Sequence, residues 1–347
     1  MARGTDVAGI KALDRTELVA LVAELGQPGF RAGQLERWLY GRNVRSFADM
    51  SDLPAGLRET LASRLALPYP EVIDRQDSKD GTRKYLLRLA GGATVETVGL
   101  PAGDRLTVCF STQAGCPMQC AFCATGIGGL VRDLGPGEMV DQVNLVAEDF
   151  GRRVTNAVAM GQGEPFANYD AVLGALRFMN ASDGPGIGAR HITVSTCGLV
   201  NGIRRFAEEP EQFTLAVSLH SAVQETRDRL MPGVRNIPLL ELRKALIGYA
   251  TTSGRRPSLE YALIANVNDS DVERSALVKF CRGLLVHVNL IPVNPVAETG
   301  FKRASAERVE AFQRGLHVAG IEVSIRAERG TDIDAACGQL RQRAQSS

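Results

Sequence analysis

The stretch LTVCFSTQAGCPMQCAFC, residues 106–123, places three closely spaced cysteines directly after a strand-like apolar run. They are Cys116, Cys120 and Cys123, and their C-x3-C-x2-C spacing allows three thiolates to bind one metal centre. A [4Fe-4S] cluster normally takes four cysteine ligands, so a compact set of three leaves one iron open to another molecule. The stretch therefore predicts an iron–sulfur centre that takes part in chemistry.

Further strand-like runs follow this stretch, with amphipathic helical segments between them. With the run that opens the motif, they cover residues 106–112, 155–160, 191–196, 213–219, 258–264 and 285–292. The clearest helical segments cover residues 138–150, 169–180, 239–250, 271–282 and 306–319. Parallel strands need crossover helices, and right-handed crossovers curve the sheet. We therefore predict an α/β fold, a (β/α)6 partial barrel of the TIM type, with functional groups at the carboxyl ends of the strands.

The segment before the motif has a different pattern. Residues 10–70 show helical periodicity, as in Leu18, Val22 and Leu25, which predicts a small helical N-terminal domain. Two extended runs around Gly91-Gly92 then predict a β-hairpin. After the last helical segment, alternating apolar residues at 321–325 predict a further strand, which leads into a C-terminal tail.

Residues 30–47 combine four arginines with Trp38 and Tyr40. Guanidinium groups contact phosphates and aromatic rings stack on unpaired bases, so this segment is a candidate RNA-binding surface. An amphipathic helix with Trp38 in the core and the arginines in water explains the same pattern. The bulk charge does not decide between them, because 40 basic and 39 acidic residues give a net charge of only +1.

Composition bears on the cellular setting. Charged residues interrupt residues 11–25, which argues against a signal peptide, and no apolar run approaches the roughly 20 residues that a membrane helix needs. The seven cysteines are an odd number with three clustered, which fits a reducing compartment better than a disulfide framework. We expect a cytoplasmic protein that does not associate with a membrane.

Polar residues and glycines follow several of the predicted strands. Taken singly, each is an ordinary loop residue, but strand ends meet at one rim, where ribose hydroxyls, a carboxylate and an adenine edge could be bound. Together they predict a nucleoside pocket formed by Gly163, Glu164, Ser195, Ser218, Leu219, His220 and Asn294.

The cysteine motif, with Phe122 before its last cysteine, resembles the signature of radical S-adenosylmethionine enzymes. The whole chain resembles the radical S-adenosylmethionine methyltransferases that modify an adenine of 23S ribosomal RNA at C2. Close relatives of those enzymes methylate C8 and confer antibiotic resistance. The resemblance is carried by the runs at residues 95–101, 161–165, 218–220 and 329–340, together with Cys109, which lies seven residues before Cys116.

The resemblance implies an enzyme with a [4Fe-4S] cluster, held by the three clustered cysteines, and S-adenosylmethionine bound at the open iron. It implies that one S-adenosylmethionine methylates Cys337 and that a second yields a radical that abstracts hydrogen from the S-methyl group. The resulting methylene radical adds to adenine C2. Glu96 then accepts a proton from the protein–RNA adduct, and Cys109 attacks the sulfur of Cys337 to release the methylated RNA.

The resemblance also implies a division of the chain and a set of partners. The expected parts are a helical RNA-binding domain at 1–75, a hairpin extension at 76–101, the barrel at 102–330 and a tail at 331–347 that carries the methyl-accepting cysteine. The expected partners are 23S ribosomal RNA, transfer RNA at the adenine 3′ to the anticodon, and a small electron donor such as flavodoxin or ferredoxin.

Three alternatives stay open at this point. The enzyme could methylate C8 of the same adenine, or it could be a radical S-adenosylmethionine enzyme with non-methylating chemistry, for which Cys109 and Cys337 would be dispensable. The clustered cysteines could instead hold zinc in a non-catalytic RNA-binding protein, because zinc also takes Cys3His ligand sets. Without the resemblance, Glu96 would be read as an outward-facing hairpin residue. Cys281 is predicted to be a core residue, and Cys197 is given no role.

Overall fold

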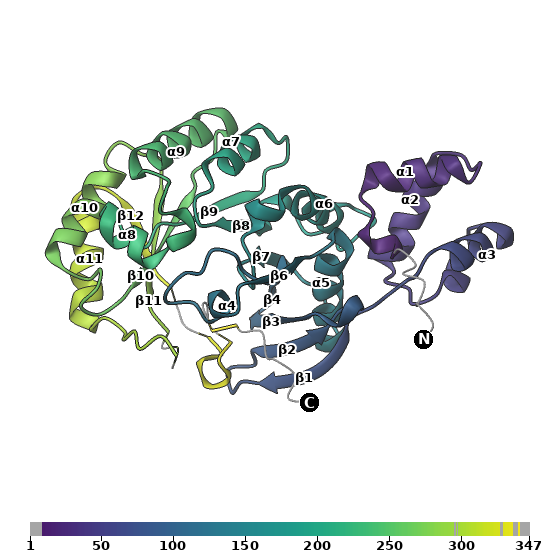
Figure 1. The fold of residues 1–347 in the computed structure, drawn as a ribbon, viewed down its shortest axis with the longest axis horizontal. Helices are drawn as coiled ribbons and strands as arrows, with labels where there is room; N and C mark the ends of the chain where they lie inside the picture. Colours follow the sequence, from purple (N-terminus) through teal and green to yellow (C-terminus); the bar gives the residue numbers. More distant parts are fainter. Residues whose placement is uncertain (1–8, 295, 297, 327–328, 336–338, 341–347) are drawn as a thin grey trace.

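The computed structural model describes residues 9–294, 296, 298–326, 329–335 and 339–340. Its largest element is a ten-stranded sheet with the order β1-β2-β3-β4-β7-β8-β9-β10-β11-β12 (Figure 1). Between β4 and β12, each strand in this order pairs in parallel with the next. These strands are β4 (Arg105–Cys109), β7 (Asn156–Ala159), β8 (Ile192–Thr196), β9 (Thr214–Ser218), β10 (Ser258–Leu263), β11 (His287–Pro292) and β12 (Glu322–Ile325). The six predicted parallel strands are all present, and the α/β prediction is confirmed.

Helices connect successive parallel strands, as crossover connections require. They are α5 (Pro136–Phe150), α6 (Tyr169–Asn180), α7 (Val200–Glu208), α9 (Leu239–Ser253), α10 (Asp271–Cys281) and α11 (Ala306–Val318), with the short α8 (Gln224–Leu230) before α9. Helix α5 shows why the sequence gives these bounds. Pro136 occupies its first turn, where the missing N–H costs nothing, and Gly151 ends it in the left-handed region at φ 61°.

The sheet is extended at one edge by antiparallel strands. Strands β2 (Arg83–Arg88) and β3 (Thr94–Ala102) form the hairpin predicted around Gly91-Gly92, and β3 pairs with β4. Strand β1 (Glu71–Asp77), which the sequence analysis did not predict, pairs with β2 at the edge. A separate two-stranded sheet, β5 (Gln113–Gly115) and β6 (Leu130–Asp133), flanks the cysteine loop and the short α4 (Ala124–Ile127).

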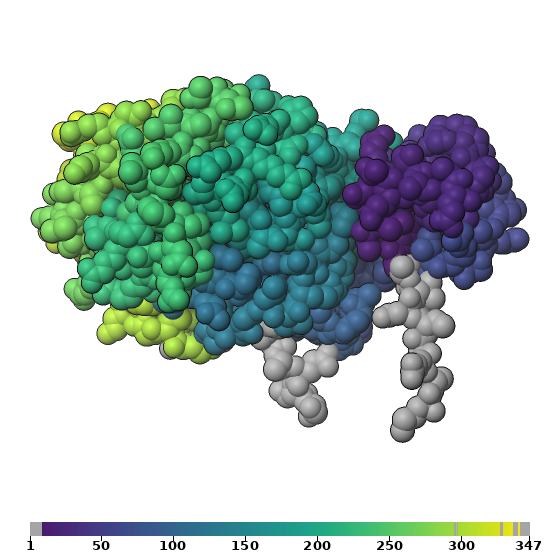
Figure 2. Space-filling view, turned by 45° about the horizontal axis from the view of Figure 1, so that its top comes forward, coloured from purple at the N-terminus to yellow at the C-terminus, as the bar shows by residue number. Residues whose placement is uncertain are grey.

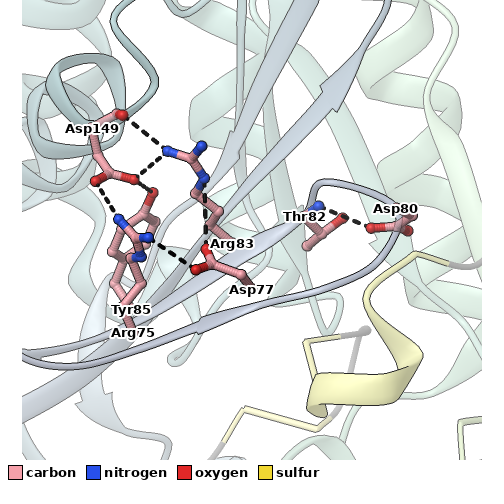
Figure 3. Close-up of polar contacts among 7 residues, drawn as sticks. All are labelled: Arg75, Asp77, Asp80, Thr82, Arg83, Tyr85 and Asp149. Atoms are coloured by element: carbon pink, nitrogen blue, oxygen red, sulfur yellow. Dashed lines mark hydrogen bonds and ion pairs between the residues drawn. The ribbon is translucent and has the colours of Figure 1, made fainter.

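Asp149, near the end of α5, fastens these edge strands to the body of the molecule (Figure 3). Its carboxylate accepts hydrogen bonds from Arg75 at 2.8 Å, Arg83 at 2.7 Å and the Tyr85 hydroxyl at 2.6 Å. Charge-assisted bonds of this kind are among the stronger hydrogen bonds in proteins. The first strands therefore hold a defined position against α5.

The N-terminal helices form a lobe at one end of the molecule (Figures 1 and 2). The lobe contains the 3-10 turn η1 (Ile10–Ala12), α1 (Arg15–Glu24), α2 (Phe30–Glu36), the π-helical turn η2 (Arg37–Gly41) and α3 (Ala55–Arg64). A buried ion pair joins Lys11 of the lobe to Asp141 of α5, and the Tyr40 ring stacks on Phe178 of α6 at 4.2 Å. The predicted helical character is confirmed, and the lobe is packed on the barrel helices.

The aromatic residues of the candidate RNA-binding segment are mostly in the core. Trp38 is 6% exposed and Tyr40 is 1% exposed, because they face the other helices of the lobe and α6. They are therefore not available to stack on bases, which corrects that part of the RNA-surface interpretation. Arg37, Arg42 and Arg45 are exposed, as in the alternative amphipathic arrangement. Within the described residues, none of the helices is both long and apolar enough to cross a bilayer.

Candidate active site

The three clustered cysteines lie on a loop between β5 and α4 that backbone contacts hold in place. The Cys116 N–H donates to the Gly129 carbonyl at 2.8 Å, and the Ala121 N–H donates to the Leu230 carbonyl at 2.9 Å. Gly115 permits the first contact, because its φ is 78° and a Cβ there would lie 2.0 Å from the Gly129 oxygen. Only glycine fits this position, so the sequence QAG-C fixes the start of the loop.

All three cysteines line one pocket at the carboxyl ends of the parallel strands. The strand ends and following loops contribute Met160, Gly163, Glu164, Ser195, Thr196, Ser218, His220, Glu260, Asn294 and Arg326. Apolar walls come from Met231, Ile291 and Val293. The structure thus brings the cysteines together with six of the seven residues predicted to bind a nucleoside.

Leu219 is the exception among the predicted pocket residues. Its side chain is fully buried in the main hydrophobic core, and its backbone N–H donates to the Glu260 carbonyl at 3.0 Å. Successive side chains of an extended chain point to opposite faces, so Ser218 and His220 face the pocket while Leu219 faces away. A side-chain role for Leu219 in ligand binding is therefore not supported.

Glu164 shapes the glycine loop from inside. Its carboxylate accepts hydrogen bonds from the backbone N–H groups of Cys197 at 2.7 Å and Phe166 at 3.0 Å. Burial raises the pKa of this carboxyl group, and these hydrogen bonds oppose the shift. Glu164 therefore joins the loop after β7 to the end of β8, so two walls of the pocket are fixed relative to each other.

His220 is held as a neutral ring. Burial lowers its pKa to about 3, and its Nδ1 accepts a hydrogen bond from the Ala262 N–H at 3.0 Å, so the proton of the neutral ring lies on Nε2. The ring meets Phe122 edge-on at 4.7 Å between centroids. The aromatic residue before Cys123 therefore packs the cysteine loop against the strand ends.

The structure adds pocket residues that the sequence analysis missed. Glu260 is 5% exposed, accepts a hydrogen bond from Asn289 at 2.9 Å and lies 3.7 Å from Arg326. The sequence signal that could have identified Glu260 is its position as a charged residue inside the apolar run of β10. Cys197 also lines the pocket, and burial and a hydrogen bond with the Cys120 thiol raise its pKa, the hydrogen bond having the larger effect.

Glu96 and Cys109 lie on the sheet face that points away from α5. Val98 of β3 pairs with Cys109 of β4, and Val98, Cys109, Ala335 and Leu340 form one apolar cluster with Met160 packed against it. Glu96 has the same strand parity as Val98 and is 1% exposed, so it is not an outward-facing hairpin residue. Cys337 lies outside the described residues, but the tail residues on either side of it belong to this cluster.

The Thr125 hydroxyl connects the tail to the cysteine loop. It donates to the Leu340 carbonyl at 2.6 Å, and Thr125 lies two residues beyond Cys123, the last cysteine of the motif. The tail cluster and the pocket therefore share a boundary formed by Thr125 and Met160.

Comparisons with known proteins agree with this arrangement. Residues 9–67 match the ribosomal RNA large subunit methyltransferase N-terminal domain, and residues 110–277 match the radical SAM superfamily. A probable dual-specificity RNA methyltransferase RlmN from Synechococcus elongatus is 46% identical over 343 residues, which cover 97% of this chain and 94% of that protein. The corresponding protein from Symbiobacterium thermophilum is 47% identical over 333 residues, covering 95% of this chain and 90% of that protein. The chain belongs to the RlmN family.

The crystal structure of a radical SAM methyltransferase from Sphaerobacter thermophilus supports the same assignment, with a TM-score of 0.90 at 44% identity. The matched region covers 97% of this chain and 100% of the Sphaerobacter chain. This RlmN-family protein is therefore a radical S-adenosylmethionine methyltransferase, and its class uses a [4Fe-4S] cluster and S-adenosylmethionine. The family resemblance stated from the motifs is confirmed.

The pocket suits both cofactors. Three sulfurs on one loop are the ligands that an iron–sulfur cluster takes, while serine hydroxyls, an asparagine amide and apolar walls suit a nucleoside. Burial raises the pKa of Cys116 to about 12 and also raises that of Cys123, so both thiols are protonated without metal. Because a coordinated thiol loses its proton, iron binding would release a proton from each. Within the described residues no three His, Cys, Asp or Glu side chains could hold a single metal ion, whereas the cysteines of a cluster bind different irons.

Replacing Gly163 with alanine is expected to weaken S-adenosylmethionine binding about tenfold, or about 1.4 kcal/mol, because the added Cβ would shift the loop that lines the pocket. Gly163 has φ 108°, and a Cβ there would lie 2.6 Å from the Thr112 hydroxyl and 2.8 Å from the Gln113 nitrogen. Calorimetric titration of anaerobically reconstituted protein measures the affinity. The matched control is Gly103→Ala, at φ 56° with open space around it, which should bind with wild-type affinity. Equal affinities for the two variants would contradict the tight fit.

Proposed function

We propose that this enzyme methylates C2 of an adenine in 23S ribosomal RNA and, as a second substrate, the adenine 3′ to the anticodon in transfer RNA. The named relatives, at 46–47% identity over nearly the whole chain, are described as probable dual-specificity RNA methyltransferases. The match of residues 9–67 to a ribosomal RNA methyltransferase domain supports the ribosomal substrate. A small electron donor such as flavodoxin or ferredoxin would supply the reducing electron.

Aromatic C2 of adenine carries a hydrogen that no ordinary base removes, so the proposed route passes through a radical. When bound, the cluster and S-adenosylmethionine supply a carbon-centred radical. In this proposal Cys337 carries the methyl group as a thioether, Glu96 accepts a proton from the protein–RNA adduct, and the Cys109 thiolate attacks the Cys337 sulfur. Before that attack the radical adduct loses one electron together with the proton that Glu96 accepts, which restores the aromatic ring. The attack then forms a disulfide and breaks the bond between the Cys337 sulfur and the carbon on the RNA. The electron pair of that bond stays with the carbon, which takes up a proton to become the methyl group.

The observation that carries this proposal is the shared sheet face. Glu96 and Cys109 lie on it, the tail packs on it, and Met160 and Thr125 connect it to the cysteine pocket. Glu96 and Cys109 therefore lie on one sheet face beside the cofactor pocket, and the proposal adds Cys337 of the tail to them.

RNA from cells that express this protein should contain 2-methyladenosine in both ribosomal and transfer RNA, and RNA from cells lacking the gene should not. Nuclease digestion followed by chromatography and mass spectrometry separates 2-methyladenosine from 8-methyladenosine. Purified ribosomal and transfer RNA incubated with the reconstituted enzyme provide the matched test in vitro. Formation of 8-methyladenosine would contradict the C2 assignment, and modification of one RNA alone would contradict dual specificity.

A further inference from the structure

Lys84 is a buried cation that the proposed reaction has not used. It lies in β2, where Tyr85 on the opposite face reaches Asp149 of α5, so the Lys84 side chain points to the face that the tail covers. Lys84 also pairs in register with Val98, the neighbour of Cys109. Lys84, Val98 and Cys109 therefore form a row across three strands.

The Lys84 ammonium group contacts both Glu96 and the tail. Its Nζ lies 3.6 Å from the Glu96 Oε1, with side-chain exposures of 4% and 1%, and it donates a hydrogen bond to the Asp334 carbonyl at 3.2 Å. Asp334 precedes Cys337 by three residues. Lys84 thus joins the proposed proton acceptor to the segment that presents the proposed methyl carrier.

The tail does not need Lys84 in order to stay in place. The turn between β1 and β2 holds it separately, because Asp80 accepts from the Gly330 N–H at 3.1 Å and the Ser78 hydroxyl donates to Asp332 at 2.6 Å. Figure 3 shows this turn, with Asp80 and Thr82, beside the ribbon of the tail. Beyond the cysteine, Thr125 binds the Leu340 carbonyl.

The stability of the fold does not by itself explain the buried Lys84–Glu96 ion pair. Removing two charges from water is expensive, and apolar residues of similar volume often stabilise a fold at least as well as a buried ion pair. A carboxylate at position 96 is useful as a base only when it is ionised, and an adjacent cation favours that state. The pair therefore has a chemical use that an apolar substitute would lack.

We propose that Lys84 is a positioning residue for RNA release, which keeps the Glu96 carboxylate ionised and oriented toward the tail segment that carries Cys337. The inference rests on the proposed role of Glu96 in taking a proton from the adduct. Lys84 itself touches Glu96 and the tail backbone and need not touch RNA.

The test uses the full-length, reconstituted enzyme with RNA and measures the covalent protein–RNA adduct on denaturing gels. Glu96→Gln should leave the adduct in place, because the proton is not removed. Lys84→Gln keeps a donor for the Asp334 carbonyl but loses the charge. It should slow adduct release about tenfold or more, a part of the roughly 10²–10⁴ that a positioned base contributes. Lys84→Arg, which restores the charge, should recover release, and the exposed Lys79→Gln in the same hairpin should match the wild type.

The outcomes separate the two hypotheses. If Glu96→Gln leaves no adduct, the proposed role of Glu96 fails whatever Lys84 does. If Glu96→Gln retains the adduct while Lys84→Gln releases RNA as fast as Lys79→Gln, the inference about Lys84 is overturned. Mass spectrometry of Cys337 methylation should give the wild-type value for Lys84→Gln, which shows that the fold and the earlier step are intact. If Lys84→Gln does not fold, Lys84→Met with the same readouts takes its place.

Discussion

Replacing Cys337 with alanine is expected to abolish methyl transfer to RNA and to leave the iron and sulfide content of the protein unchanged. The proposed route passes the methyl group through the Cys337 sulfur, and alanine has no atom that can carry it. The cluster cysteines lie on a different segment, so their loop should assemble as before. Methyl-labelled S-adenosylmethionine, with mass spectrometry of both protein and RNA, measures the transfer, and chemical analysis measures iron and sulfide.

The matched control is Cys281→Ala. Cys281 is 1% exposed in the core beside Leu277 and Phe280 on α10, as the sequence analysis predicted, so its loss should cost stability and spare methyl transfer. The comparison separates a chemical role from the loss of a small apolar side chain. RNA methylation at the wild-type rate by Cys337→Ala would contradict the thioether route. That result would favour radical chemistry for which Cys109 and Cys337 are dispensable.

Local pattern was enough to predict most of the barrel. The helix predicted at 169–180 is α6 (Tyr169–Asn180), and the strand predicted at 191–196 is β8 (Ile192–Thr196). Buried parallel strands are apolar runs and their crossover helices are amphipathic, so both periods are visible in one sequence. Strand β1 lacks that signal. It carries Asp74, Arg75 and Asp77, its residues are exposed or half-buried, and only pairing with β2 makes it a strand.

The candidate site was predictable where it is local in sequence or follows the strand-end rule. The cysteine loop is one continuous motif, and Ser195, Ser218 and Asn294 line the pocket because they follow parallel strands. Leu219 was predicted as part of a three-residue run, and the alternation of faces along that run places its side chain in the core. The burial of Trp38 and Tyr40 could not be predicted, because it depends on tertiary packing. Helical periodicity does not say which neighbouring element covers an aromatic ring.

Contacts that depend on register or on distant segments could not be predicted. Lys84 and Glu96 meet because β2 and β3 pair with one particular offset, and a shift of one residue would place Lys84 on the α5 face. Thr125 and Leu340 are 215 positions apart, and no periodicity links them. These contacts join the tail, the proposed base and the cysteine loop, so the structure contributes most at the point where the proposed chemistry takes place.

Replacing Cys123 with alanine is expected to remove most of the bound iron and sulfide and to reduce methyl transfer to background. Cys123 is one of three thiolates that hold the cluster in this class of enzyme, and two thiolates leave a second iron without a protein ligand. Cys123 also lies two residues before Thr125, whose hydroxyl donates to the Leu340 carbonyl. Its loss should therefore disturb the boundary between the pocket and the tail. Iron and sulfide analysis and electron paramagnetic resonance of the reduced protein measure the cluster.

Cys197→Ser provides the matched control for this prediction, because Cys197 also lines the pocket but lies outside the motif. It should keep wild-type iron and sulfide, since the C-x3-C-x2-C spacing supplies every protein ligand that the open cluster needs. Loss of the cluster in Cys197→Ser with retention in Cys123→Ala would mean that the ligand set had been assigned wrongly. Loss in both would mean that Cys197, as well as the motif, is needed to hold the cluster. We expect Cys197→Ser to retain the cluster and Cys123→Ala to lose it. The backbone contacts of the cysteine loop with Gly129 and Leu230 do not involve Cys197 and remain intact in Cys197→Ser.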